Sequence, residues 1–171
     1  MISESKNLIV RKTRNGKGLF IKKSFKPGQK IFQVRGKIIQ EEKFVNLSHR
    51  IRSNSFRFDS KNYLSPKGET GNFLNHSCNP NCTVKKVKNK LFIISTRNIK
   101  SNSELLMDYS TIIASDDFWK MKCKCGEKNC RKVIGKFNHL PKKILKKYLK
   151  SKVVPEYILK IKESNNTVLL Y

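Results

Sequence analysis

The segment Asn75-His76-Ser77-Cys78-Asn79-Pro80-Asn81 decides how this sequence is interpreted. By composition it is a polar loop with a proline turn, and its Asn and His side chains can order the loop through hydrogen bonds to backbone groups. The loop also holds one cysteine, Cys78, and a second, Cys82, follows it directly. These residues by themselves predict an ordered polar loop whose function depends on the rest of the chain.

Three more cysteines stand close together farther along the chain. Cys123, Cys125 and Cys130 are spaced as Cys-x-Cys-x4-Cys in CKCGEKNC. Tetrahedral zinc needs four ligands, so the fourth must come from elsewhere, and Cys78 or Cys82 is available. A shared zinc would hold this segment against the middle of the chain. Free thiols and an iron–sulfur cluster are the alternatives.

Lysine and arginine dominate the charge of the chain. Its 171 residues include 38 Lys and Arg against 12 Asp and Glu, a formal net charge of +26. Residues 59–127 hold 11 basic and 7 acidic residues, so the two flanks carry most of the surplus. A cationic chain is attracted to polyanions, which predicts nucleic-acid contact through the basic flanks. The competing interpretation is a solvated, lysine-rich surface.

Length and composition exclude several classes of protein. At 171 residues with 37% hydrophobic residues, the chain predicts one domain with a small appendage and a real core. No apolar run is long enough to span a membrane, and the N-terminus has no apolar signal region. Five cysteines fit a disulfide framework poorly. We therefore expect a monomer with no membrane partner in a reducing intracellular compartment, the cytoplasm or nucleoid, with the nucleus as the alternative.

Short β-prone runs separated by turns predict a mostly β fold. Asn7–Lys12 and Leu19–Ile21 flank an Asn-Gly turn, which is a hairpin signal. Val84–Val87 and Leu91–Ser95 predict a second hairpin. Residues 116–135 are expected to be loop-like. Further strands are expected at Ile31–Val34, Lys37–Gln40, Phe56–Phe58 and Asn62–Leu64.

Helical periodicity appears only late in the sequence. Pro141 stands near the start of this segment, where its ring is tolerated. Lysines fill the positions between the apolar residues, which predicts an amphipathic helix. The apolar residues that show the period are Leu140, Ile144, Leu145, Tyr148 and Leu149.

Four motifs, in order, resemble those of the SET-domain family of protein-lysine methyltransferases. NHSCNPN, residues 75–81, is similar to the signature segment of that family. GKGLF at 16–20 resembles its N-terminal GxG segment, ELLMDY at 104–109 its ELxxDY segment, and CKCGEKNCR at 123–131 its post-SET zinc motif. Residues 137–157 resemble, less closely, the C-terminal extension of compact microbial members. The chain is therefore identified as a member of this family.

The resemblance implies a particular fold. It is a mostly β SET fold of several small sheets, with a threaded C-terminal segment, a post-SET zinc loop and a short helical tail. Threading is implied by the resemblance alone, since general rules of chain topology argue against it. The implied divisions are a SET domain at 7–115, a post-SET zinc-binding segment at 116–135 and a partly helical, Lys-rich extension at 136–171.

The resemblance also implies a function, S-adenosylmethionine-dependent methylation of a protein lysine. The substrate would be a basic chromatin-type or ribosome-associated protein. Tyr109 matches the catalytic tyrosine, and Tyr63 matches a tyrosine that lines the lysine channel. The zinc ligands implied are Cys78, Cys123, Cys125 and Cys130. The positions matching cofactor-contacting residues are Gly16, Lys17, Gly18, Leu19, Asn72, Asn75, His76, Tyr109 and Lys124.

Two positions depart from the family pattern. Met107 stands where Phe or Tyr is usual, two residues before Tyr109, and that position influences how many methyl groups are added. Methionine is flexible and lacks a hydroxyl, which predicts multiple methylation. Gly68-Glu69 replaces the usual Gly-Asn pair. The alternative function is a zinc-stabilised, non-catalytic nucleic-acid-binding or interaction module; the intact Tyr109 and the two glycines, Gly16 and Gly18, favour the enzyme.

Overall fold

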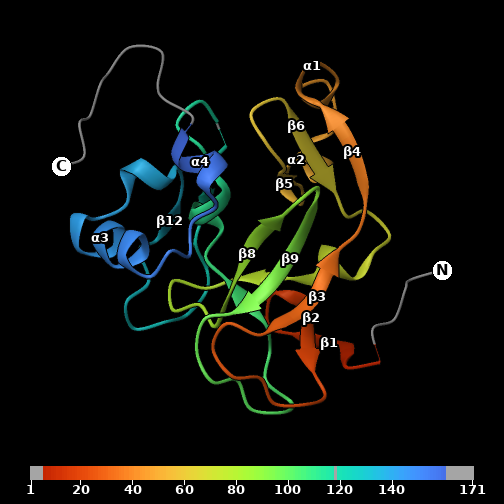
Figure 1. Cartoon of the computed structure of the whole chain (residues 1–171), viewed down its shortest axis with the longest axis vertical. Helices are drawn as coiled ribbons and strands as arrows, with labels where there is room; N and C mark the ends of the chain where they lie inside the picture. Colours follow the sequence, from red (N-terminus) through yellow and green to blue (C-terminus); the bar gives the residue numbers. More distant parts are fainter. Residues whose placement is uncertain (1–5, 118, 161–171) are drawn as a thin grey trace.

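The protein is described by a computed structural model that covers residues 6–117 and 119–160 (Figure 1). Within these residues the chain forms four small β-sheets with short helices between them. The expected mostly β fold is therefore confirmed. The first sheet is the predicted N-terminal hairpin, β1 (Leu8–Thr13) and β2 (Gly16–Ile21), whose turn brings Gly16 to a φ of 105°. This positive φ explains the glycine, because other residues rarely adopt it.

The second sheet is the largest and carries most of the core. Its strand order is β3-β9-β8-β10-β7. The second predicted hairpin forms its centre, with antiparallel pairing between β8 and β9. Along β9 the side chains of Leu91, Ile93 and Ser95 are buried while the residues between them are more exposed, as expected for a strand with one face on the core. The strands are β3 (Lys30–Val34), β7 (Asn75–His76), β8 (Cys82–Val87), β9 (Lys90–Ser95) and β10 (Leu106–Met107).

The short strand β10 lies between β7 and β8, which are joined by the loop 77–81. It pairs in parallel with both neighbours. The loop also holds β10 directly, since Ser77 N donates to Met107 O at 3.0 Å and Asn81 N donates to Leu106 O at 2.9 Å. The chain after residue 104 therefore passes beneath this loop, which is the threaded segment that the sequence analysis expected.

A third sheet and two short helices lie beside the central sheet. Its order is β4 (Lys37–Gln40), β6 (Asn62–Ser65) and β5 (Phe56–Arg57). Between β4 and β5 the chain forms α1 (Glu41–Phe44) and α2 (His49–Ser53), which the sequence analysis did not predict. One helical turn is too short to show a 3.6-residue period, so the pattern of apolar residues carries no signal there.

The segment 116–135, which the sequence analysis expected to be loop-like, is only partly a loop. It contains a two-stranded ribbon, β11 (Met121–Lys122) paired with β12 (Val133–Ile134), and the cysteine motif forms the turn that joins them. The predicted amphipathic helix is confirmed as α3 (Lys142–Lys150), and α4 (Glu156–Lys160) follows. Residues 161–171 of the expected extension lie outside the described residues. None of the helices in the described part of the chain is long and apolar enough to cross a membrane.

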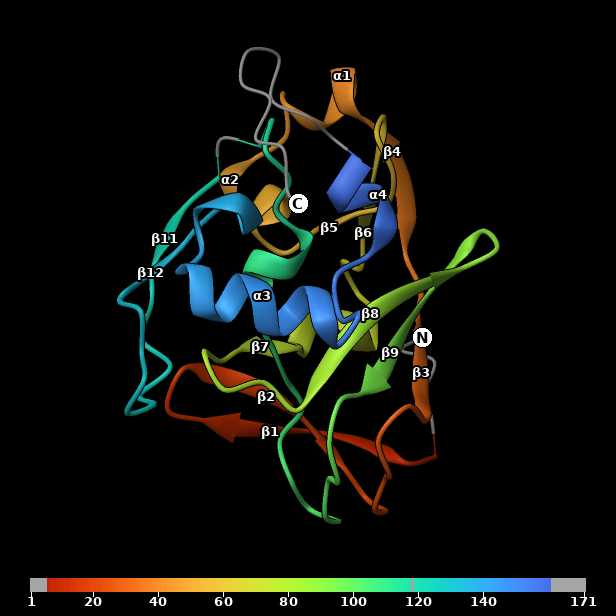
Figure 2. The same ribbon diagram turned by 60° about the vertical axis from the view of Figure 1, so that its left-hand side comes forward.

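The helix α3 packs on a second apolar cluster, separate from the main core. Ala114, Phe137 and Tyr148 are among its buried members. Figure 2 shows α3 on the near side of the molecule, between the β11–β12 ribbon and the β8–β9 hairpin. The described part of the chain also contains three 3-10 turns: η1 (Thr70–Phe73), η2 (Tyr109–Ile112) and η3 (Phe137–His139).

Candidate active site and metal centre

A cavity of about 370 Å³ opens between the β4–β6–β5 sheet and the chain around η2. Four side chains singled out from the sequence line it, although the first and last are 46 positions apart in the chain, at 63 and 109. They are Tyr63, Asn72, Met107 and Tyr109. Trp119 closes the cavity from the C-terminal segment, and its ring centroid lies 6.5 Å from that of Tyr109.

Tyr109 is held at both its backbone and its hydroxyl. The hydroxyl donates to Leu74 O at 2.5 Å, and the backbone N donates to His76 Nδ1 at 3.1 Å. The rings of Tyr109 and His76 meet edge to face, with centroids 5.3 Å apart. Burial raises the pKa of the Tyr109 hydroxyl far above its usual value, so it stays protonated at neutral pH. It can therefore donate and accept hydrogen bonds without bringing a charge to the cavity.

His76 is a neutral orienting group in this arrangement. Its burial, partly opposed by the Asp108 carboxylate, lowers the pKa of His76 to about 4. Because Nδ1 accepts from Tyr109 N, the remaining proton lies on Nε2, which is 3.5 Å from Cys78 Sγ. The imidazole thus joins the tyrosine backbone to the cysteine cluster.

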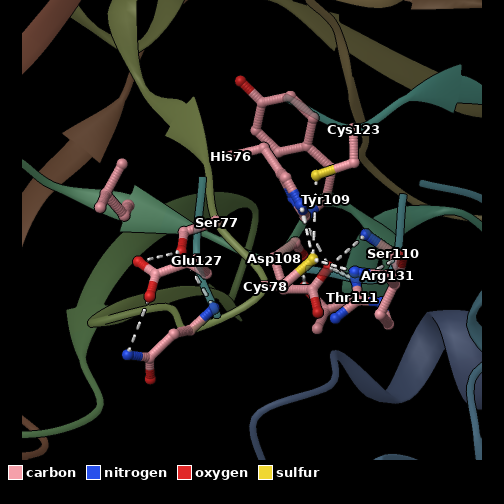
Figure 3. Close-up of polar contacts among 12 residues, drawn as sticks. His76, Ser77, Cys78, Asp108, Tyr109, Ser110, Thr111, Cys123, Glu127 and Arg131 are labelled. Atoms are coloured by element: carbon pink, nitrogen blue, oxygen red, sulfur yellow. Dashed lines mark hydrogen bonds and ion pairs between the residues drawn. The ribbon is translucent and has the colours of Figure 1, made fainter. Parts of the chain in front are cut away.

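Asp108, directly before Tyr109, is a fully buried carboxylate. It accepts from Arg131 Nη2 at 2.7 Å and from Ser110 N at 3.1 Å (Figure 3). It also accepts from the Tyr148 hydroxyl at 2.8 Å. The cysteine-rich segment and α3 are therefore both tied to the residue beside Tyr109. Sequence reasoning missed Tyr148, because its place among the apolar residues of α3 indicated only a core side chain.

Tyr63 lines the cavity, but its hydroxyl is engaged in a charged network. It donates to Asp117 Oδ1 at 2.6 Å and accepts from Arg57 Nη1 at 2.8 Å, and Arg57 also forms an ion pair with Asp116 at 3.0 Å. Burial first, and then the Asp117 carboxylate, raises the pKa of Tyr63. The Tyr63 ring stacks on Phe44 with centroids 3.7 Å apart. The sequence contained no signal for Arg57, which lies in an ordinary β-prone run.

Three of the four proposed metal ligands come together with His76. The ligand atoms of His76, Cys78, Cys123 and Cys125 all lie within 4.8 Å of one another. The sulfurs of Cys78 and Cys123 are 3.8 Å apart. Two thiolates that share a tetrahedral zinc at about 2.3 Å stand roughly 3.8 Å apart, so this spacing fits zinc.

Cys130 lies beside the same cluster, and Cys82 does not take part in it. Cys130 packs against the apolar residues around the cluster and accepts a hydrogen bond from Lys132 N at 3.4 Å. Cys82 is buried elsewhere, where its thiol donates to Leu106 O. Arg131 N points to Cys78 Sγ at 3.4 Å, and amide hydrogen bonds of this kind suit thiolates that bind a metal.

The glycine segment meets Asn75 but lies apart from the cavity. Asn75 Nδ2 donates to Lys17 O at 3.1 Å and to Glu104 Oε1 at 2.8 Å. A Cβ at position 18 would lie 3.0 Å from Asn75 Nδ2 and would collide with the Glu104 carboxylate, so a larger residue there would have to displace these side chains. The Leu19 side chain is fully buried in the core, which leaves only its backbone for a ligand.

Lys124 lies at a second, shallower depression of about 480 Å³. The turn of the β1–β2 hairpin and the cysteine-rich segment form its walls. Arg14 joins the two walls by donating from Nη2 to Lys124 O. Gly16 follows Arg14 by two residues, so this depression adjoins the glycine segment.

Residues 16–110 match the SET domain. This chain belongs to the SET-domain family. The matched residues contain β2, the central sheet and Tyr109, and the match ends within η2, while β1 precedes it. The zinc ligands proposed after residue 120 and the helix α3 lie beyond the match, so the cysteine cluster joins the SET domain, through Cys78, to the segment that follows it.

Curated relatives with similar sequences are named as histone methyltransferases. Over 145 residues the chain is 34% identical to "Histone-lysine N-methyltransferase, H3 lysine-36 specific" of Emericella nidulans, covering 77% of this chain and 15% of the relative. It is 32% identical over 139 residues to the protein of the same name from Coccidioides immitis, covering 74% and 14%. It is 30% identical over 139 residues to human "Histone-lysine N-methyltransferase 2B", covering 74% and 5%. The chain thus spans only a small part of the length of these relatives.

Proposed function

We propose that this SET-domain chain transfers methyl groups from S-adenosylmethionine to a lysine side chain of a protein. The observation that supports this most directly is the placement of Tyr109. Tyr109 lines the cavity, its hydroxyl donates to Leu74 O, and His76 holds its backbone N. The two oxygens, of Tyr109 and Leu74, lie together beside the cavity. Such oxygens can make weak C–H···O contacts with an electron-poor methyl group.

The chain contributes positioning and a dry environment for the attacking amine. S-adenosylmethionine supplies, when bound, a methyl group on a sulfonium that is already a good leaving group. The target lysine must be neutral to attack, although its ordinary pKa is about 10.4. The apolar part of the cavity wall, formed by Phe44, Met107 and Trp119, disfavours its charged form, and the carboxylates that also line the cavity are paired with Arg57. Most of the acceleration then comes from orientation and from fixed dipoles.

The cofactor is proposed to lie where the glycine segment meets Asn75. Gly16 and Gly18 carry no Cβ, so the backbone of this segment can approach a ligand closely. Backbone groups of Gly16, Lys17, Gly18 and Leu19 would hold its methionine end, together with Asn75 and His76. Asn72 and Tyr109 would approach it from the cavity side, and Lys124 would border the second depression.

Zinc is proposed to be held by Cys78, Cys123, Cys125 and Cys130. The spacing of sulfurs and the nearby amide donors support a thiolate site. His76 Nε2 is the competing fourth ligand by distance, but Nδ1 accepts from Tyr109 N, so Nε2 carries the proton of the neutral ring and offers zinc no free lone pair. Zinc would secure the segment that carries Trp119 over the cavity.

Two cavity residues are proposed to govern substrate and product. Tyr63 lines the lysine channel, and its engaged hydroxyl makes it a rigid wall rather than a proton carrier. Met107 is fully buried beside Tyr109 and has no hydroxyl with which to tether the amine, so more than one methyl group can be added.

The substrate is proposed to be a basic, chromatin-type protein. The relatives named above are histone methyltransferases, which supports a histone-like protein more than a ribosome-associated one. Activity on chromatin would place the chain in a nucleus or nucleoid. The earlier alternative, a non-catalytic module, predicts nucleic-acid binding without cofactor binding.

Incorporation of labelled methyl groups tests the proposal. The full chain is incubated with labelled S-adenosylmethionine and, separately, with core histones and ribosomal proteins. Tyr109→Phe should abolish incorporation, because it removes the hydroxyl that lines the cavity. Tyr157→Phe is the matched control, since it removes another tyrosine hydroxyl, that of a residue that does not line the cavity and donates to the backbone oxygen of Arg57. Incorporation that survives Tyr109→Phe, or DNA binding with no cofactor binding, would favour the non-catalytic module.

A further inference from the structure

The face of α3 that points away from the second apolar cluster consists of lysines. Ile144, Leu145 and Leu149 pack against the cluster, and Tyr148 is buried in it. All five lysines of α3 are exposed, and their spacing places them on the opposite side of the helix. They are Lys142, Lys143, Lys146, Lys147 and Lys150.

No acidic residue balances this lysine face locally. Residues 128–155 contain ten Lys and Arg and no Asp or Glu. Within the described ranges, 6–117 and 119–160, the five lysines form no ion pair. Lysines four residues apart on one helix repel each other, so the lysine face by itself destabilises the helix. The buried side of α3 compensates for this, and the charge on the outer side is left available to a partner.

We propose that the lysine face of α3 docks on the phosphate backbone of duplex DNA. The nine residues of α3 extend about 13.5 Å, and duplex DNA carries about one phosphate charge per 1.7 Å of axis with both strands counted, so roughly eight phosphates, about four on each strand, lie along that length. Each lysine can therefore reach a separate phosphate. A membrane surface is a poorer partner, because the apolar side of α3 is already covered by the protein and cannot enter lipid. An acidic protein is also poorer, because the face offers no apolar or aromatic anchor.

The docking face is rigidly connected to the proposed active site. Tyr148, on the inner side of α3, donates to the buried carboxylate of Asp108, and Tyr109 follows directly. DNA held on the outer side of α3 is thus held at a fixed position relative to the cavity. This use of docking rests on the proposed methyl transfer to a chromatin-type protein. DNA would also offset the repulsion between a chain of net charge +26 and a lysine-rich substrate.

The salt dependence of DNA binding tests the docking surface. The full chain and two variants are titrated against a labelled duplex of about 20 base pairs between about 50 and 200 mM salt. One variant carries Lys143→Gln, Lys146→Gln and Lys150→Gln, and Gln preserves helix propensity. The control carries Lys22→Gln, Lys26→Gln and Lys100→Gln, which remove the same charge from exposed loop positions. Circular dichroism checks that both variants fold.

The α3 variant should lose the contribution of three phosphate contacts. The slope of log K against log salt becomes shallower by about 2.7, so its affinity relative to wild type changes by roughly 40-fold over this salt range. The control should keep the wild-type slope. Equal losses in the two variants, an unchanged slope in the α3 variant, or equally strong lysine-dependent binding to anionic vesicles or to a poly-glutamate peptide would overturn the proposal.

Methylation assays separate this proposal from the proposed function. The α3 variant should methylate a free histone peptide as wild type does, while its methylation of nucleosomes falls. If wild type methylates the peptide and the α3 variant binds DNA as tightly as wild type does, the proposed docking surface is wrong and the proposed function is unaffected. If the α3 variant binds DNA more weakly than wild type but wild type methylates no protein, the docking surface is supported and the proposed enzyme activity is wrong.

Discussion

Replacement of Tyr148 by Phe tests whether α3 stabilises the loop that carries Tyr109. Phe keeps the ring in its apolar pocket and removes only the hydroxyl that donates to Asp108 Oδ2 at 2.8 Å. Asp108 then depends on Arg131 and on Ser110 N alone. A hydrogen bond to a charged group contributes about 1.5–3 kcal/mol, so Tyr148→Phe should lower the free energy of unfolding by that amount.

Tyr157→Phe is the matched control for this measurement. Its hydroxyl is also buried, but it donates to a neutral acceptor, Arg57 O, at 2.7 Å. A neutral pair contributes about 0.5–1.5 kcal/mol, so the control should cost less. Urea unfolding of wild type, Tyr148→Phe and Tyr157→Phe gives the loss of unfolding free energy in each variant, provided that the dependence of that free energy on urea concentration has the same slope in all three. If Tyr148→Phe costs no more than Tyr157→Phe, Asp108 does not act as the charged acceptor argued above.

The pH dependence of the stability difference between wild type and Tyr148→Phe gives a second readout. Burial, and then the Asp108 carboxylate, raises the pKa of Tyr148, so the folded state favours the protonated hydroxyl. A folded pKa above the unfolded value of about 10 contributes stability that is complete below pH 10 and is lost as the pH rises further. The advantage of wild type over Tyr148→Phe should therefore be constant near pH 8 and shrink by pH 11. A difference that stays constant or grows would refute the reasoning.

Three further predictions concern the cofactor segment, the metal and the product. Gly18→Ala should destabilise the fold by about 1–3 kcal/mol through overpacking and weaken cofactor binding in calorimetry, whereas Gly135→Ala, which meets no atom within 4 Å, should do neither. Cys125→Ser should lose bound zinc in elemental analysis and lose the effect of chelators on melting temperature, while Cys82→Ala keeps its zinc; zinc retained by Cys125→Ser contradicts the ligand set. Wild type should form di- or trimethyl-lysine by mass spectrometry and Met107→Phe fewer methylated states; monomethyl-lysine alone from wild type, with higher states from Met107→Phe, reverses the role assigned to that side chain.

Much of the site was accessible from local sequence patterns. The hairpins are encoded by turns and alternating strands, and the spacing of Cys123, Cys125 and Cys130 already suggests a metal loop. By contrast, the network around Arg57 was missed, because an arginine in a β-prone run indicates only an exposed position. The structure buries that side chain almost completely and pairs it with Asp116 and Asp117.

The sequence by itself determined the order of the motifs, the mostly β character and the amphipathic nature of α3. These depend on neighbours a few residues apart, where turn chemistry and periodicity act. Only the tertiary structure decided that Tyr148 reaches Asp108 across 40 positions and that Tyr63 reaches Asp117 across 54. Such pairings arise from how separate elements pack, and no local period in a single chain records them.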